Sequence, residues 1–389
     1  MSLSGTYEYF AQDRILFGKP VASALEEEFA RSPAERVFVI STRTLSRKTD
    51  VVDGLRETLG ARFAGLFDDC VSHVPRQTVM AAAAAAREAR PDRIIAIGGG
   101  SAIDIAKMVL VVMGENLTEA AQLDPFYVKV DDAGRSSVPP IRPSGIRQIS
   151  IPTTLSGAEF SHTAGAVDER RHVKDLYIQR DLAAPAVVLD PAITVHTPEW
   201  VWLSSGMRAV DHAIESICSR TAHPFTDSTC LHALGMLHRS LLATKADPAD
   251  LKERLDGQVG VWLASTGMMR GQYGASHGLS FHLSAIAEVP HGHCSCVLLP
   301  AVLRYNKPVN ADRQGRVAEM LGRAGEDAAD ALTAFIGELG LPTHLRDVGI
   351  RREHFAQIAA DAMHNLLVRN NPRPVNHPDD VLAILEMAW

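Results

Sequence analysis

The feature that most constrains this chain is an apolar run that ends in three consecutive glycines. Residues 93–97 (Arg-Ile-Ile-Ala-Ile) lie between Pro91 and Gly98, and a helix-forming stretch over residues 102–113 follows the glycines. A short apolar run bounded in this way predicts a strand in the core of a sheet. Strands that alternate with helices are typical of parallel sheets with crossover helices. The segment therefore predicts an α/β fold for this part of the chain.

The turn itself, Gly98-Gly99-Gly100-Ser101, predicts a phosphate-binding site. Backbone N–H groups at the N-terminus of a helix favour an anion, and a Cβ at any of these glycines would block close approach of the backbone. Ser101 is placed to cap the helix or to contact the phosphate. A tight turn without a ligand fits the same residues, since the pattern is neither the GxGxxG fingerprint nor a P-loop.

The length of 389 residues and the pattern of elements indicate two domains. Residues 1–191 alternate strands, expected over 36–41 and 62–74, with helices over 46–59 and 77–89. Residues 131–143 predict a surface loop or hairpin. Residues 192–389 predict helices over 202–219, 228–242, 250–269, 313–323, 328–340 and 354–363. The expected fold class is an N-terminal α/β domain followed by an all-α C-terminal domain.

Composition excludes several classes of function. A net charge of −7 gives no electrostatic argument for a nucleic-acid partner. Every apolar stretch is far shorter than the ~20 residues that a membrane span needs, and the N-terminus lacks the basic and then apolar order of a secretory signal. Five cysteines, an odd and sparse set, predict reduced thiols in the cytosol. We expect a cytoplasmic protein without a membrane partner.

Seven segments resemble, in the right order, motifs of the group III (iron-containing) alcohol dehydrogenases. Residues 98–107 resemble the loop GGGSxxDxAK, which holds the NAD(P) pyrophosphate in that family, and residues 151–159 resemble its PTTxxxGSE segment near the nicotinamide. The other matches are Lys174 and residues 188–191, 206–215, 290–292 and 371–374. The resemblance implies the dehydroquinate synthase-like fold, a homodimer and NAD(H) or NADP(H). It also implies cofactor contacts from Gly98, Gly99, Gly100, Ser101, Asp104, Thr153, Thr154, Gly157 and Lys174.

Within that family the chain is most similar to the maleylacetate reductases. The similarity rests on residues 14–18 (RILFG), on 73–75 (HVP) and on Ser41-Thr42 at the end of the strand over 36–41. Many relatives have an Asp at this strand end, which binds the ribose 2′-OH of NAD. Ser41, Thr42 and Arg43 stand here instead, and Arg43 predicts that NADPH is accepted alongside NADH. The alternative is that Arg43 and the nearby cations are solvated surface groups.

The metal ligands of the family are only partly retained. Metal-dependent relatives use an Asp, a His four residues later and two further histidines; His212, His277 and His291 match the histidines, but Arg208 replaces the Asp. A guanidinium has no lone pair to offer a cation and repels it. On a helix, Asp211 lies roughly 100° from the face shared by Arg208 and His212, and Glu215 is placed to pair with Arg208.

Three interpretations of this set stay open. In the first, no metal binds, and Arg208 with the histidines attracts a carboxylate substrate and polarises its ketone. In the second, the three histidines still hold Zn²⁺ or Fe²⁺ with an open position. In the third, the histidines are structural remnants. The proton donor is also open, because Phe281 stands where relatives usually have a His, so that His277, the neighbouring His282 or a water would serve.

These observations predict an NAD(P)H-dependent reductase of a small oxo acid such as maleylacetate, acting by direct hydride transfer. The expected catalytic set is Arg208, His212, His277, His291 and His282. The main alternative is an iron- or zinc-dependent alcohol dehydrogenase for small alcohols and aldehydes. A lyase of the dehydroquinate synthase type and a non-enzymatic NAD(P)-binding protein are the two more distant alternatives.

Overall fold

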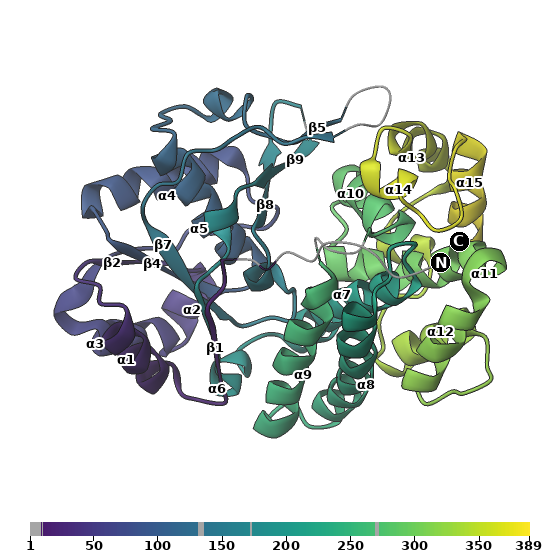
Figure 1. Cartoon of the computed structure of the whole chain (residues 1–389), viewed down its shortest axis with the longest axis horizontal. Coiled ribbons are helices and arrows are strands. Elements are labelled where there is room, and N and C mark those ends of the chain that lie inside the picture. The colour runs from purple at the N-terminus through teal and green to yellow at the C-terminus, as the bar shows by residue number, and fades with distance from the viewer. Residues whose placement is uncertain (1–8, 10, 131–135, 172, 269–271) are drawn as a thin grey trace.

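The structure is a computed structural model that describes residues 9, 11–130, 136–171, 173–268 and 272–389. It has two halves that lie side by side (Figure 1). The half from the N-terminus, purple to teal in the figure, contains the sheet. The half from about residue 190 onward, teal-green to yellow, consists of helices in its described part. The predicted fold class, α/β followed by all-α, is confirmed.

A six-stranded sheet forms the first half, with strand order β1-β10-β7-β4-β2-β3 and parallel pairing throughout. Its central strands are almost entirely buried, as expected for a sheet covered on both faces, and β7 includes the buried polar residues Gln148 and Ser150. Helices α1 (Val21–Arg31) and α3 (Val51–Leu59) cover one face, and α4 (Arg76–Ala89) and α5 (Gly100–Gly114) cover the other. The strands are β1 (Arg14–Phe17), β2 (Val37–Ile40), β3 (Phe63–Phe67), β4 (Arg93–Gly98), β7 (Arg147–Pro152) and β10 (Ala186–Leu189).

Two antiparallel hairpins extend from this half. Strands β5 (Lys129–Val130) and β6 (Ser136–Ser137) pair with each other, and residues 131–135 between them lie outside the described residues. Of the segment predicted as a loop or hairpin, residues 136–137 belong to this pair, whereas 138–143 contain no strand. Strands β8 (Thr163–Asp168) and β9 (Val173–Ile178) form the second hairpin, which the sequence patterns did not predict. The second hairpin carries Lys174 toward the helical half.

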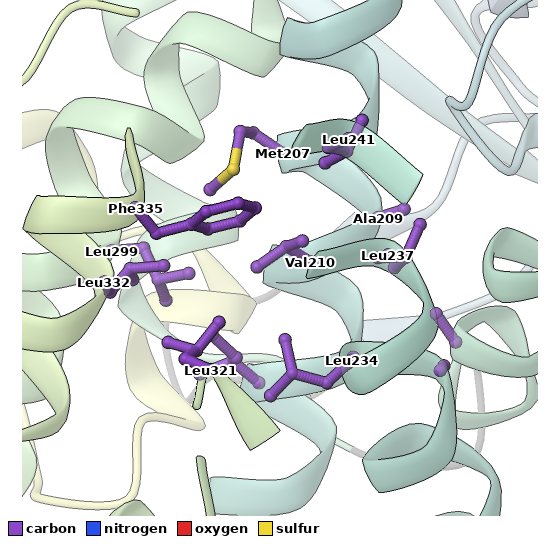
Figure 2. Packing of buried hydrophobic residues seen from close by; sticks show 14 of the residues in the cluster. Met207, Ala209, Val210, Leu234, Leu237, Leu241, Leu299, Leu321, Leu332 and Phe335 are labelled. Carbon is purple, nitrogen blue, oxygen red and sulfur yellow. The ribbon is translucent and has the colours of Figure 1, made fainter. Parts of the chain in front are cut away.

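The helical half is built around α7 (Glu199–Cys218), most of whose residues are buried. Figure 2 shows Met207 and Val210 of α7 facing Phe335 and Leu299 from other helices. The remaining long helices are α8 (Pro224–Ala246), α9 (Leu251–Ala264), α10 (Ala275–Ala287), α11 (His291–Met320) and α12 (Ala328–Glu338). Shorter ones follow as α13 (Phe355–Ala362), α14 (Leu366–Arg369) and α15 (Pro378–Met387).

Several predicted helices in this half have different bounds in the structure. The helix expected over 313–323 is present as the part of α11 beyond the kink at Asn310 (φ −147°), two residues after Pro308, and it ends at Met320. The helix expected over 228–242 is longer and runs from Pro224 to Ala246. The helix expected over 250–269 ends at Ala264, where a short 3₁₀ turn begins. Among the described helices, none is long and apolar enough to cross a membrane.

Candidate active site

The predicted phosphate-binding turn lies at the carboxyl end of β4, with Gly99 as the N-cap of α5. A Cβ on Gly100 would lie 2.9 Å from Ser156 Oγ, and one on Gly99 would lie 3.1 Å from Thr154 Cγ2. The glycines are therefore required for the close approach of residues 154–156. The helix begins at Gly100, two residues earlier than predicted, so the prediction that Ser101 caps it is wrong. Contact of Ser101 with a phosphate stays a prediction.

The segment over residues 153–157 packs against the glycine turn over residues 98–101. We call these two segments together the cradle. Thr153 donates its N–H to Gly98 O at 3.0 Å. The hydroxyl oxygens of Thr154 and Ser156 are buried, and neither has a hydrogen-bond partner among the described residues. Gly157 (φ +76°) touches the helical half, since a Cβ there would lie 3.5 Å from His212 Cε1. Unpaired buried hydroxyls beside the glycine turn at a helix N-terminus fit the phosphates of a dinucleotide.

The arginines that follow β2 are paired with acidic side chains, so this end of the strand carries both positive and negative charges. Thr42 caps the short helix α2 (Arg43–Lys48) and Ser41 is buried. Arg43 forms an ion pair with Asp69, and Arg47 Nε lies 3.0 Å from Asp68. Sequence reasoning missed these acids because they follow β3, more than 20 residues along the chain. Acceptance of NADPH stays a prediction, and a 2′-phosphate would compete with Asp69 for Arg43.

Asp104 and Lys174 meet at the β8–β9 hairpin. Asp104 Oδ2 accepts the N–H of Gly165 at 3.4 Å. The side chain of Lys174 crosses Gly165, where any Cβ would overlap its Cε atom. Burial and the charge of Arg208 lower the pKa of Lys174, whereas Asp104 opposes the shift. Lys174 therefore lies between the cradle and the helical half, close enough to Arg208 for their charges to interact.

In the helical half, Arg208 pairs with Asp211 and not with Glu215. Its Nη1 lies 3.5 Å from Asp211 Oδ2 and 3.2 Å from Ser295 Oγ. Asp211 is fully buried and accepts hydrogen bonds from Ser276 (2.8 Å) and Ser295 (2.6 Å). The predicted Arg208–Glu215 pair is wrong because the serines of α10 and α11 hold Asp211 beside the guanidinium. The pocket is therefore not purely cationic, since a carboxylate lies behind Arg208.

Glu215 instead fixes His277 at the start of α10. Its carboxylate accepts the backbone N–H groups of Gly274 and Ser276, each at 3.0 Å, and lies 2.7 Å from His277 Nδ1. Asn371 Oδ1 accepts the next free N–H, that of Ala275, at 3.1 Å. Such a carboxylate selects the tautomer and the orientation of the ring. His277 thereby presents Nε2, which is buried and lacks a partner among the described residues.

The predicted histidines gather around Arg208, with one exception. The rings of His212 and His277 stack at 5.0 Å between centroids, and Tyr273, which sequence reasoning missed, stacks on His277 at 4.1 Å. Burial and nearby cations, Arg208 among them, lower the pKa values of His212 and His291 well below the usual range. His282 stands apart, since the charged side chain that acts on it is Asp361 of α13.

His277 differs from the other two in its protonation. Burial and Arg208 act to lower its pKa, but the carboxylates of Asp211 and Glu215 outweigh them, and the net shift is upward. A buried imidazole whose pKa is raised by two neighbouring carboxylates is suited to donate a proton. The site therefore combines a permanent cation, neutral histidines and one protonatable histidine.

Comparison with known proteins identifies the family. Residues 12–191 match the model for iron-containing alcohol dehydrogenase, and residues 202–389 match the C-terminal model of the Fe-containing alcohol dehydrogenase family. The chain belongs to the iron-containing alcohol dehydrogenase family. It is accordingly an NAD(P)-dependent oxidoreductase. The predicted homodimer and cytoplasmic location stay predictions.

Relatives with curated names span nearly the whole chain. Dehydrogenase FUM7 of Gibberella moniliformis is 30% identical over 96% of this chain and 95% of its own length. Maleylacetate reductase of Sphingobium indicum is 28% identical over 96% and 95%. Among solved structures, maleylacetate reductase from Rhizobium sp. strain MTP-10005 has a TM-score of 0.80 at 25% identity, covering 100% of this chain and 99% of that one. The similarity to a maleylacetate reductase-like subgroup is thus present in both sequence and fold.

The donor set of this iron-containing alcohol dehydrogenase family member departs from a four-ligand metal site. The guanidinium of Arg208 lies close to the three imidazoles: its charge contributes to the lowered pKa of His212 and His291 and opposes the raised pKa of His277. The same positive charge would repel a dication. Atoms of Asp211, Glu215 and His277 do lie within 4.8 Å of one another. Most of them, however, already hydrogen-bond to serine hydroxyls, to backbone N–H groups or to each other. A metal there would have to displace this network.

Proposed function

We propose that the protein is an NAD(P)H-dependent reductase of a small oxo acid, with maleylacetate or a close analogue as substrate. The observation that carries the proposal is Arg208, a permanent cation beside three histidines where the family's metal-dependent members have a carboxylate ligand. The maleylacetate reductase relatives at 28% identity support the same substrate class. A guanidinium attracts a carboxylate and stabilises negative charge that develops on a carbonyl oxygen.

When bound, the reduced nicotinamide supplies a hydride to the carbonyl carbon, or to the alkene carbon of a conjugated oxo acid. In either case electrons move onto the carbonyl oxygen, and this is the charge that Arg208 offsets. Gly98 to Ser101, with Thr154 and Ser156, would hold the phosphates of the cofactor, and Lys174 would contact the cofactor from the β8–β9 hairpin. His277 delivers the proton from Nε2, while Glu215 keeps its ring in place.

We also propose that this reaction requires no metal. The alternative is an iron- or zinc-dependent alcohol dehydrogenase that retains His212, His277 and His291 as ligands. The unpaired ring nitrogens of His212 and His277 favour this second candidate. The guanidinium of Arg208 favours the first, because it occupies the neighbourhood of all three histidines with a charge of the wrong sign for a metal.

The experiment that tests the substrate class compares matched ketones with and without a carboxylate. NADH and NADPH oxidation is followed with maleylacetate, with its dimethyl ester and with short aldehydes. The proposal expects kcat/KM for the acid to exceed that for the ester by at least about tenfold, the equivalent of ~1.4 kcal/mol. Equal or faster turnover of the ester and the aldehydes would favour the alcohol dehydrogenase.

A further inference from the structure

The segment that leads into α4 has an unfavourable backbone. His73 (φ +64°) and Val74 (φ +58°) are consecutive residues in the left-handed region, and Val74 is a buried β-branched residue. This conformation costs roughly 1–2 kcal/mol per L-residue. Strain of this kind persists only where the surroundings hold it, and it concentrates at functional sites. His73 and Val74 are therefore candidates for a functional role.

The surroundings that hold the segment belong to the β8–β9 hairpin. Val74 O accepts the N–H of Val167 at 2.9 Å. The side chain of Arg76, two residues further on, is buried and donates to Asp168 (3.3 Å), Asp175 (2.8 Å) and Tyr177 OH (2.8 Å). The strained segment and the hairpin that carries Lys174 are therefore held as one unit.

The result of the strain is the position of the His73 side chain. Its ring lies 6.1 Å, between centroids, from the ring of His291, which belongs to the helical half. The charged side chains that act on His73 are Lys174 and Glu288. His73 is only half-buried, so packing of its own ring does not account for the strained backbone. The imidazole of His73, from the α/β half, therefore lies next to His291, a histidine of the candidate site in the helical half.

We propose that His73 is a specificity-determining residue that hydrogen-bonds to the end of the oxo acid remote from the reacting carbonyl. Arg208 and His277 act on the carbonyl from the helical half, while His73 and Lys174 face the same site from the α/β half. The substrate is thereby held from both sides. This proposal rests on the proposed function, and it assigns to His73 contact with substrate and no part in proton transfer.

The test is His73→Asn, because asparagine tolerates the left-handed backbone but is shorter than histidine. We expect KM for maleylacetate to rise about tenfold, the loss of roughly one hydrogen bond, with kcat and the Kd for NADPH changed less than twofold. His293→Asn is the matched control: His293 stacks on Trp200 at 5.8 Å, and its loss should leave KM unchanged. A merely structural role of His73 would lower Tm without raising KM, and this result would overturn the proposal.

A second measurement separates this proposal from the proposed function. Binding of maleylacetate to the protein–NADPH complex of the His277→Gln variant, which retains Arg208 and which we expect to turn over slowly, is followed by the fluorescence of bound NADPH. The titration is repeated with His73→Asn added. If the parent protein does not reduce maleylacetate, the proposed function fails, and the titration still decides on His73. Weaker binding on adding His73→Asn supports the contact; equal binding, or no binding at all, overturns it.

Discussion

The cofactor cradle and the cluster around Arg208 face each other but are built in different ways. The cradle consists of glycines, backbone N–H groups and the hydroxyls of Thr154 and Ser156, all within two short segments that adjoin in the sheet. The cluster consists of charged side chains from α7 together with histidines and serines from α10 and α11. Its bonds join residues far apart in sequence, with His277 62 positions from Glu215 and Ser295 84 positions from Asp211.

This difference explains what could be predicted from the sequence. The cradle follows from local chemistry, because a strand, three glycines and a helix fix its geometry in consecutive residues. The resemblance to the family motif then predicted its ligand. The sequence predicted which residues form the cluster, but it did not predict which of them form ion pairs. Hydrogen bonds from Ser276 and Ser295 hold Asp211, rather than Glu215, beside Arg208.

The β8–β9 hairpin was missed for a related physical reason. Its strands contain Asp168, Lys174 and Asp175, which interrupt the apolar pattern of a buried strand. These charges are tolerated because Arg76 and two further arginines, Arg170 and Arg171, pair with the aspartates across the hairpin. A buried ion network between residues more than 90 positions apart leaves no local signature in the sequence. His73 entered only as a family resemblance, since its role depends on that network.

The largest expected effect separates the two regions directly. Arg208→Met should lower kcat/KM for maleylacetate roughly 10²–10³-fold, the usual loss when one group that stabilises an oxyanion is removed. The Kd for NADPH, measured by fluorescence titration, should change less than threefold. The kcat/KM of Arg208→Lys should lie between those of the parent protein and Arg208→Met, because lysine keeps the positive charge but lacks the planar, two-pronged guanidinium. A comparable loss of cofactor affinity in Arg208→Met would break the distinction between cradle and cluster.

A smaller effect concerns the carboxyl group buried behind the cradle. Glu159 is 1% exposed, and burial raises its pKa to about 7 from an ordinary 4.5. The folded state holds this proton more tightly than the unfolded state, so the stabilisation is complete below about pH 4.5 and is lost as the pH rises through 7. The loss reaches at most about 3 kcal/mol. Glu159→Gln should remove this decline.

Urea unfolding of parent and Glu159→Gln at pH 5, 6, 7 and 8 measures the decline as a difference between the two curves. Exposed Glu88 provides the control, and Glu88→Gln should follow the parent at every pH. The free energy of unfolding of Glu159→Gln could instead fall as steeply as that of the parent when the pH rises from 5 to 8. Glu159 would then be ionised in the folded state over this whole range, and a charged group would lie behind the cradle.

The smallest effect sharpens the claim that the cradle depends on missing side chains. Gly100→Ala would place its Cβ 2.9 Å from Ser156 Oγ, whereas a Cβ on Gly54 of α3 meets nothing within 4 Å. Both changes favour the helix by up to about 1 kcal/mol. We expect only Gly100→Ala to weaken NADPH binding, by about tenfold. Equal affinity in the two variants would show that the close approach of residues 154–156 is unnecessary for the cofactor.

The most direct test of the central claim, that Arg208 takes the place of the metal, is the metal content of the purified protein together with its activity after chelation. The protein is produced with iron and zinc in excess, analysed for both elements and assayed with maleylacetate and NADPH before and after EDTA. We predict far less than one metal ion per chain and turnover that resists the chelator. One tightly bound iron or zinc per chain, with activity lost on its removal, would contradict the account.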